Sequence, residues 1–248
     1  MSEPAVLNPI SRVSVAERKD YVRALFCMVS QRYDLLNSVL SLLLDRYWRW
    51  QTVQLLRDYP SGPVLDLCAG TMPLSRALIR ACPERTVLAV DFCETMLRTG
   101  LQPRSRSGHR ERIYPVCGDG EEIPAPSNTF CGCTVGFGLR NLTQTRQGLA
   151  EIHRVLRPGA RLLVLELSRP QQPLVRTLYN CYLHQILPRL AGLYSGYREA
   201  YEYLARSVAA FYPPEELLAL LQESGFHSVE QRQLSLGIVS IYIGHKQT

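Results

Sequence analysis

The spacing of hydrophobic residues changes along this chain, and the change divides it into three parts. Between Val15 and Leu56, apolar residues recur at helical spacing, for example at Val22 and Leu25. After the break at residues 60–63, short apolar runs alternate with helical segments. The last part returns to helical spacing before two short apolar runs. The pattern predicts a helical N-terminal part, an alternating middle, and a helical stretch followed by two strands.

Strands and helices are predicted to alternate in the middle part. The expected strands are Val64–Cys68, Thr86–Val90, Ile113–Cys117, Cys131–Val135 and Arg161–Leu167. The expected helices are Leu74–Cys82, Cys93–Leu101 and Gln147–Leu156, the last ended by the stop signal Arg157-Pro158-Gly159. Strands joined by helices of this length pair in parallel and form a doubly wound sheet, which binds ligands outside the carboxyl ends of its strands.

The C-terminal part departs from this alternation. It predicts helices at Leu174–Tyr194, Glu199–Phe211 and Pro214–Ser224, and an antiparallel strand pair at Ser228–Leu234 and Ile238–Gly244. We therefore expect an α/β fold with a doubly wound, mostly parallel sheet of seven strands. Residues 1–60 are expected to form a helical cap over the substrate site, and residues 61–248 the main domain. Within it, residues 171–212 are expected to form a helical insertion that lines the substrate pocket.

Composition and net charge indicate which classes of binding partner to expect. The chain of 248 residues is 46% hydrophobic and 20% charged, which is typical of a globular protein. Its net charge of +6 favours acidic partners, whether nucleic acid, anionic lipid or an anionic ligand. One arginine cluster lies in a connector without a nearby aromatic residue, at Arg98, Arg104, Arg106, Arg110 and Arg112. We interpret it as a solvated loop and expect no nucleic-acid partner.

The cysteines and the N-terminus favour a cytoplasmic protein. The first residues contain Glu3 and Pro4 and do not resemble a secretory signal, and no apolar run reaches the length of a membrane-spanning helix. The eight cysteines are scattered, which indicates reduced thiols. Cys131 and Cys133 would share one face of a regular strand, but no histidine or further cysteine lies near them. We expect no metal site.

The first predicted strand carries Asp66 and runs into a glycine turn at Gly70 and Thr71 that opens a helix. Such a turn lets the backbone approach a ligand and offers unpaired N–H groups to a carboxylate or phosphate. Twenty residues after Thr71, Asp91 ends the second strand, where an acid suits the hydroxyls of a ribose. Only one glycine of the dinucleotide fingerprint is present, which disfavours a dehydrogenase. Alternatively, Asp91 caps the helix that begins near Glu94.

Two further strand ends carry polar groups. Asp119, with Gly120 beside it, follows the third strand and is a sensible acceptor for an adenine amino group, although an aspartate between glycines is often a plain turn. Phe137-Gly138-Leu139-Arg140-Asn141 follows the fourth strand and puts a charge and an amide at the ligand edge.

Several motifs together resemble one enzyme family. They are Tyr33-Asp34-Leu35-Leu36-Asn37, residues 64–71, residues 137–141, the run from Glu151 to Gly159, and Leu163–Ser168. These resemble the class I S-adenosylmethionine-dependent methyltransferases, and within them the ubiquinone/menaquinone C-methyltransferases of the UbiE type. The resemblance extends from about Arg32 to Gly244.

The resemblance implies S-adenosylmethionine as cofactor. It places cofactor contacts on Asp66, Gly70, Thr71, Asp91, Asp119, Gly120 and Gly136, of which the last is usually a serine in the family. The chain also departs from the family at Met72-Pro73, where Gly-Asp is usual. Proline suits the first turn of a helix. Methionine, in contrast, is expected to place a side chain beside the amino-acid end of the cofactor.

The implied reaction is methylation of a ring carbon of a demethylated quinol, either demethylmenaquinol or a polyprenyl benzoquinol. Arg140 is expected to stabilise the phenolate that forms. Asn141 is expected to orient the ring hydroxyl or a water molecule, and Tyr33, Asp34 and His184 are candidates for the proton relay. Alternatively, Tyr33 and Asp34 only begin a helix, and His184 is a satisfied core residue.

A polyprenyl quinol resides in a bilayer, so the resemblance also implies peripheral contact with the inner face of the membrane. The stretch from Leu174 to Leu193, with Arg176 and Arg189, is expected to line a tunnel for the tail or to rest on the membrane, although core packing explains the same residues. A homo-oligomer remains open. Two alternative functions also remain: methyl transfer to another small phenol or to arsenic, and an inactive binding or regulatory module.

Overall fold

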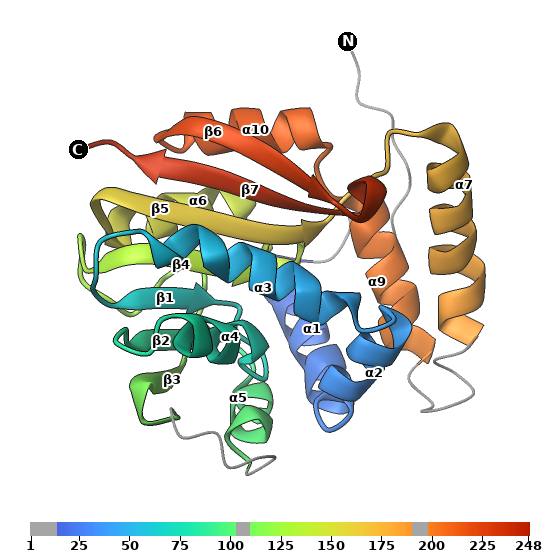
Figure 1. Ribbon diagram of the computed structural model, residues 1–248. Helices are drawn as coiled ribbons and strands as arrows, with labels where there is room; N and C mark the ends of the chain where they lie inside the picture. The colour runs from blue at the N-terminus through green and yellow to red at the C-terminus, as the bar shows by residue number, and fades with distance from the viewer. Residues whose placement is uncertain (1–13, 103–109, 190–197) are drawn as a thin grey trace.

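One mixed sheet organises the protein. The computed structural model describes residues 14–102, 110–189 and 198–248. Its strands are β1 (Val64–Leu67), β2 (Val87–Asp91), β3 (Ile113–Cys117), β4 (Phe130–Gly136), β5 (Leu156–Leu167), β6 (Phe226–Leu234) and β7 (Val239–Lys246). They form a seven-stranded sheet in the order β3-β2-β1-β4-β5-β7-β6 (Figure 1). Strand β7 runs opposite to the other six strands, so its pairs with β5 and β6 are antiparallel and all other pairs are parallel. The predicted doubly wound, mostly parallel sheet is confirmed.

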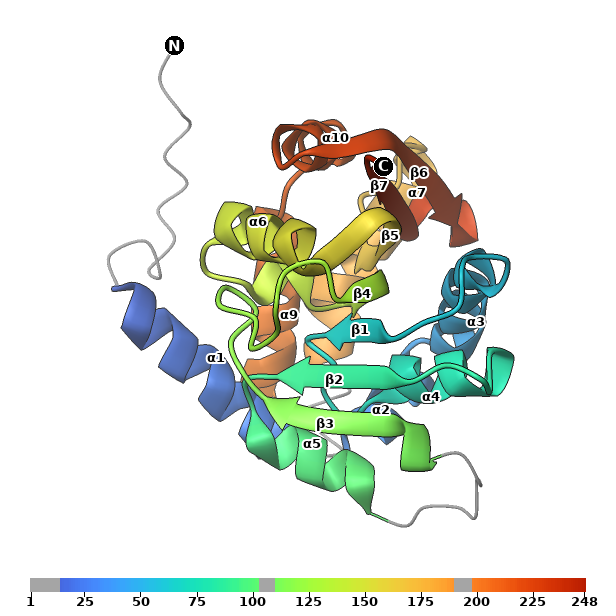
Figure 2. The ribbon, with the colours of Figure 1, turned by 90° about the vertical axis from the view of Figure 1, so that its left-hand side faces the viewer.

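Helices cover both faces of the sheet (Figure 2). They are α3 (Leu44–Arg57), α4 (Pro73–Ala81) and α5 (Glu94–Leu101) on one side, and α6 (Thr145–Val155) and α10 (Pro214–Glu223) on the other. The apolar faces of α3 and α4 bury Trp48, Leu56 and Leu78 against the sheet. On the opposite face, Leu149 and Leu221 do the same for α6 and α10. The central strands β1 and β4 are apolar on both sides because both of their faces are buried, whereas β3 and β6 at the edges are partly exposed.

The remaining helices gather at one end of the sheet (Figure 1). They are α1 (Val15–Val29), α2 (Tyr33–Leu40), α7 (Pro173–Cys181), a single π turn (Tyr182–Ile186) and α9 (Arg198–Ala210). Ser14 and Glu17 form a capping box that fixes the start of α1. The N-terminal and insertion helices pack on each other, since Leu36 and Leu40 of α2 contact the buried cluster around Tyr179 and Tyr201. The predicted limits of cap and insertion stay predictions.

The insertion has one buried and one exposed face. Tyr179, Leu183 and Leu187 pack against α9, whereas Leu174 and Leu178 are exposed. Core packing therefore explains part of the stretch, and the other part remains available for contacts. Residues 190–194 of the predicted helix lie outside the described residues.

Three expectations about the strands are wrong in detail. β5 begins at Leu156, because that residue pairs with Phe130 of β4, so the supposed stop signal lies inside the strand, where Gly159 has a φ of +77°. Pairing also extends the predicted ends of β4, β6 and β7 by one to two residues. Cys131 and Cys133 belong to the clusters on opposite faces of the sheet, because the register shifts between Phe130 and Gly132.

The arginine cluster is described only in part. Arg98 binds Glu94 one helical turn earlier at 2.8 Å, and Arg112 donates to the carbonyl of Glu84 at 2.9 Å. Arg104 and Arg106 lie outside the described residues. The two described guanidinium groups therefore make local contacts at the end of α5 and before β3.

Candidate active site

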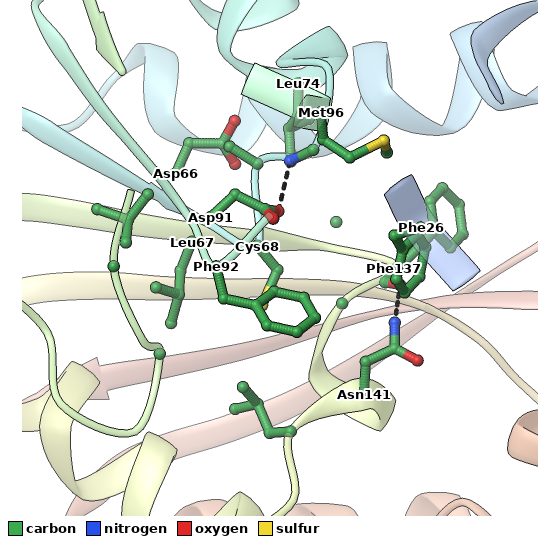
Figure 3. A pocket seen from close by; sticks show the side chains of 18 of the residues that line it. Phe26, Asp66, Leu67, Cys68, Leu74, Asp91, Phe92, Met96, Phe137 and Asn141 are labelled. Carbon is green, nitrogen blue, oxygen red and sulfur yellow. Dashed lines mark hydrogen bonds between the residues drawn. The ribbon is translucent and has the colours of Figure 1, made fainter. Parts of the chain in front are cut away.

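A pocket opens at the carboxyl ends of β1, β2 and β4, where a doubly wound sheet binds its ligands. The space between its lining atoms, which includes open solvent, is about 930 Å³. Figure 3 shows Asp66 and Asp91 on one side of it, and Phe26, Phe137 and Asn141 on the other. Two carboxylates therefore face an aromatic and amide wall.

Asp91 ends β2 with its carboxylate at the pocket. Its Oδ2 accepts a hydrogen bond of 2.8 Å from the N–H of Gly70 (Figure 3), and its Oδ1 accepts one of 2.8 Å from the N–H of Cys93. Burial raises the pKa of Asp91 to about 6. The bond to Cys93 orders the turn before α5, but the N-cap residue of α5 is Cys93 and not Asp91. Because each carboxylate oxygen can accept more than one hydrogen bond, both can still bind ribose hydroxyls.

Asp66 lies deeper, on β1. It is almost fully buried and accepts hydrogen bonds from the hydroxyl of Ser75 on α4 and from that of Thr134 on β4, the latter at 3.0 Å. Burial raises its pKa to about 6 as well. Since both oxygens already bind side chains, the carboxylate holds β1, β4 and the start of α4 together beneath the pocket.

Thr71 and Asp34 bind each other. The buried Thr71 hydroxyl donates a hydrogen bond to Asp34 at the start of α2, and Arg76 on α4 lies 3.4 Å from the same carboxylate. Neither Thr71 nor Asp34 lines the pocket, and Asp34 lines a separate hollow between α3 and α4. Thr71, predicted to bind the cofactor, and Asp34, predicted to act in the proton relay, thus attach α2 to the glycine turn.

Met72 does not enter the pocket, contrary to the sequence-based expectation. It has a φ of +62°, is almost fully buried, and packs with Ala69, Ala89 and Leu97 beneath α5. Gly100 leaves space for it, since an added Cβ there would lie 2.8 Å from the Met72 Cε. The left-handed backbone turns the side chain away from the cavity, which therefore stays open at this point.

Asp119 and Gly120 line the pocket after β3, and a lysine from α1 meets them there. The Lys19 Nζ lies 2.6 Å from Asp119 Oδ2 and 2.7 Å from Glu121 Oε2. Glu121 is buried and also accepts a hydrogen bond of 2.6 Å from the N–H of Thr143. Burial acts to lower the pKa of Lys19, but the two carboxylates raise it above its ordinary value. Sequence reasoning missed Lys19, because it lies 100 residues from Asp119 and in no motif.

Gly136 lines the pocket at the end of β4, as predicted. An added Cβ there would lie 3.0 Å from the Cδ2 of Leu74, so a serine at this position requires Leu74 to shift. The next residue, Phe137, has a φ of +58° and meets Trp48 of α3 edge to face at 6.2 Å. Helix α3 thereby supports the aromatic wall.

Arg140 forms a buried ion pair that the sequence analysis did not anticipate. Its Nη1 donates to Glu166 Oε1 at 2.5 Å and to the carbonyl of Phe137 at 2.6 Å. Glu166 on β5 is fully buried and Arg140 is 7% exposed. Burial acts to lower the pKa of Arg140, but Glu166 and the nearby tyrosines raise it. The Nε of Arg140 has no hydrogen-bond partner among the described residues. Within the described ranges, the buried Nε–H of this guanidinium is thus unpartnered, but Arg140 itself does not line the pocket.

Tyrosines from the cap and the insertion surround this ion pair. Tyr203 on α9 donates from its hydroxyl to Asn141 Oδ1 at 3.1 Å. Asn141 and Tyr33 both line the pocket, and their catalytic roles stay predictions. Burial raises the pKa of Tyr33, with the nearby Arg140 acting in the opposite direction. Tyr179 on α7 is 9% exposed, and within the described part of the chain its hydroxyl has no partner. The sequence analysis missed the roles of Tyr179 and Tyr203.

His184 does not join the site. Its side chain is exposed and lines a separate hollow between α7 and the end of α9, together with Arg169 and Arg176. It therefore fits neither the relay nor the core interpretation.

Metal ligands do not gather in the described residues. No three histidine, cysteine, aspartate or glutamate side chains there could hold one ion, and of the described cysteines only Cys68 lines the pocket. Burial raises the pKa of Cys68 well above its ordinary value, which keeps it a thiol.

Solved structures share this fold. A putative S-adenosylmethionine-dependent methyltransferase from Methanococcus maripaludis superposes with a TM-score of 0.62 over 100% of this chain and 98% of its own, at 16% identity. Human N-acetylserotonin methyltransferase, solved with S-adenosylmethionine, superposes with a TM-score of 0.59 over 100% of this chain and 61% of its own, at 18% identity.

Sequence comparison identifies nearer relatives. The ubiquinone/menaquinone biosynthesis C-methyltransferase UbiE of Geobacter sulfurreducens is 37% identical over 96% of this chain and 93% of its own. A demethylmenaquinone methyltransferase of Clavibacter sepedonicus is 39% identical over 95% of this chain and 94% of its own. The family model described as the ubiE/COQ5 methyltransferase family matches residues 13–246. The chain therefore belongs to the ubiE/COQ5 methyltransferase family.

Proposed function

We propose that the protein transfers a methyl group from S-adenosylmethionine to a ring carbon of a demethylated quinol. The observation that carries the proposal is the carboxylate of Asp91, held at the end of β2 by the N–H groups of Gly70 and Cys93 and facing one cavity with Tyr33 and Asn141. The names of the relatives, which refer to ubiquinone and menaquinone, support the substrate class.

The residues on the β1 and β2 side of the pocket fit S-adenosylmethionine. Asp91 offers acceptors to the ribose, and the buried position of Met72 leaves the glycine turn open to the amino-acid end. Phe92, Met96 and Leu142 give the pocket apolar surfaces that suit an adenine ring. When bound, the cofactor supplies an electrophilic methyl group on a sulfonium.

The opposite wall fits a phenolic ring. The unused Nε–H of Arg140 is a buried donor, and leaving such a donor unpaired costs about 1–3 kcal/mol. Arg140 does not line the pocket, so a phenolate oxygen would satisfy this donor only after the wall formed by Tyr33 and Asn141 shifts to admit the ring. Glu166 offsets most of the charge of Arg140, so the guanidinium acts by donating a directed hydrogen bond more than by net charge. Tyr203 fixes the amide of Asn141, which can orient the ring hydroxyl.

Binding and transfer can be tested separately. We expect calorimetry to detect S-adenosylmethionine binding, and Asp91→Ala to weaken it at least tenfold. A methyl-transfer assay with a short-chain demethylmenaquinol should then show turnover, which Asn141→Ala lowers more than it lowers cofactor affinity. Absence of cofactor binding at hundred-micromolar concentration would refute a methyltransferase. Binding without transfer to the quinol would instead favour another acceptor or a regulatory module.

We also propose that the turn between α2 and α3 rests on the membrane that holds the quinol. Its exposed apolar side chains, named here the apolar tip, are Leu35, Val39, Leu42, Leu43, Leu44, Tyr47 and Trp50. Leu42 and Leu43 have φ values of +52° and +64°, an unfavourable conformation that projects two leucines at the point of the turn. Arg46 and Arg80 border the adjacent hollow and suit anionic head groups.

The membrane proposal has its own test. Trp50 is exposed and Trp48 is buried, so a blue shift of tryptophan fluorescence with anionic phosphatidylglycerol vesicles would report the tip. Replacing both Leu42 and Leu43 with serine should weaken partitioning at least about a hundredfold, since each leucine contributes roughly 1.5–3 kcal/mol when buried and the two together about 3 kcal/mol or more. Leu101→Ser, at an exposed leucine on α5, is the matched control. Equal binding by all three proteins would contradict the proposal. Among the described residues, no helix is long and apolar enough to cross a membrane.

A further inference from the structure

Two cysteines from distant parts of the sequence meet beside the pocket. Cys27 lies on α1 and Cys93 immediately precedes α5, and their Sγ atoms are 2.9 Å apart. Both are thiols, Cys27 half-buried and Cys93 buried. We propose that Cys27 and Cys93 form a reversible disulfide that fastens α1 to the β2–α5 turn and restricts exchange of the bound cofactor.

The surroundings hold the two sulfur atoms in place. Helix α1 packs against α5, and the guanidinium of Arg23 lies over the ring of Phe92 at 5.6 Å. The Cys27 thiol also lies 3.6 Å from the hydroxyl of Thr95. A disulfide has an S–S distance of about 2.05 Å, so the sulfurs need to approach by less than about 1 Å.

The bond would join two walls of the pocket. Phe26, next to Cys27, and Phe92, next to Cys93, both line the cavity, and the N–H of Cys93 already binds Asp91. Helix α1 further reaches across the pocket with Lys19, whose Nζ forms ion pairs with Asp119 and Glu121. Those ion pairs can open whenever α1 moves outward. A covalent bond between Cys27 and Cys93 does not open in this way, so it would keep α1 closed over the cofactor.

The chemistry requires an oxidant, for which a low-molecular-weight disulfide such as glutathione disulfide suffices. The more accessible Cys27 thiolate attacks one sulfur of the oxidant, forms a mixed disulfide and releases one thiolate. The Cys93 thiolate then attacks the Sγ of Cys27 and expels the second. Two protein thiols lose two electrons in total, the oxidant is reduced to two thiols, and the two protons from Cys27 and Cys93 end on the released thiolates.

The second attack is expected to be slow near neutral pH. Burial, reinforced by the contact with Cys27, raises the pKa of Cys93 to about 12. Below that value the thiolate fraction, and with it the rate of closure, increases about tenfold per pH unit. The link would therefore form during sustained oxidation and not in brief pulses.

The experiment uses the full chain, oxidised with glutathione disulfide at pH 8.5 and mapped by mass spectrometry of the digested, alkylated protein. We expect a peptide pair joined through Cys27 and Cys93, which dithiothreitol removes and Cys27→Ser lacks. Cys181→Ser, at an exposed thiol on α7, should leave the link unchanged. The link should raise the melting temperature by about 5 °C. Modification at Cys117 and Cys181 without a Cys27–Cys93 peptide would overturn the proposal.

The effect on exchange rests on the proposed function and is measured last. Stopped-flow displacement should show that S-adenosylmethionine leaves the linked protein at least tenfold more slowly than the reduced protein, with the difference abolished in Cys27→Ser. An unchanged rate in fully linked protein refutes the restriction of exchange. If neither form binds S-adenosylmethionine, the proposed function fails, whereas the mapped link and the melting shift still decide whether the disulfide forms.

Discussion

Replacing Glu166 with glutamine should destabilise the protein strongly, because this charged side chain is fully buried. The Glu166 carboxylate is 2.5 Å from the Nη1 of Arg140 and also accepts hydrogen bonds from the N–H groups of Leu167, at 2.9 Å, and Arg140, at 3.4 Å. Removing one partner of a buried ion pair costs about 3–5 kcal/mol, because the other charge is left uncompensated. Glutamine keeps the shape and one acceptor, so we expect the lower end, about 3 kcal/mol.

Urea unfolding followed by far-UV circular dichroism measures this cost. With a slope of about 3 kcal/mol per M, the midpoint should fall by about 1 M. The matched double variant, Glu166→Gln with Arg140→Met, removes both charges and should recover about 2 kcal/mol relative to the sum of the two single variants. A loss below about 1 kcal/mol in Glu166→Gln, or additive losses in the double variant, would refute the reasoning. The ion pair would then contribute little to stability.

Three further predictions concern the pocket and its support. Burial raises the pKa of Asp91 to about 6, so its carboxylate becomes protonated as the pH falls below that value. The dissociation constant of S-adenosylmethionine, measured by calorimetry, should therefore rise about tenfold per pH unit below about pH 6. In Asp91→Asn this pH dependence should shrink to the part due to Asp66, and an unchanged pH profile would contradict a role for Asp91. Tyr203→Phe frees the amide of Asn141, and we expect turnover in the methyl-transfer assay to fall about tenfold with cofactor affinity unchanged, whereas an equal loss of both would indicate a merely structural role. Gly100→Ala forces a Cβ against the carbonyl carbon of Thr71, 2.8 Å away, and against Met72, so chemical denaturation should show a loss of about 2 kcal/mol; Gly159→Ala, where the nearest atom is 3.8 Å away, is a control that tests backbone strain without a clash.

The sheet could be predicted from the sequence because its signals are local. Each parallel strand is a short apolar run bounded by a turn, and the glycine turn and Asp91 follow from their positions at strand ends. The boundaries of β5 could not be predicted, since Leu156 joins the strand through its pairing with Phe130. Local sequence contains no information about that pairing.

The polar partners of the site were harder to predict, because they come from distant segments. Lys19 reaches Asp119 across 100 residues, and Tyr203 reaches Asn141 across 62. Glu166 did carry a signal, since a single acid inside the apolar run Leu162–Leu167 requires a buried partner. For Met72 the error was conformational: its left-handed backbone, which sends the side chain beneath α5, is not apparent from its residue type.

Because Met72 packs into the space left by Gly100, the residue on the glycine turn and the residue on α5 depend on each other. A chimera that grafts the Gly-Asp turn usual in the family onto this chain would leave a methionine-sized void beneath α5. In the reverse graft, Met72 would clash with the Cβ of any residue other than glycine at position 100, because that Cβ would lie 2.8 Å from its Cε. Exchange of cofactor turns among these enzymes should therefore carry α5 with the turn as one segment, because the compatibility of the turn is decided below the pocket and not within it.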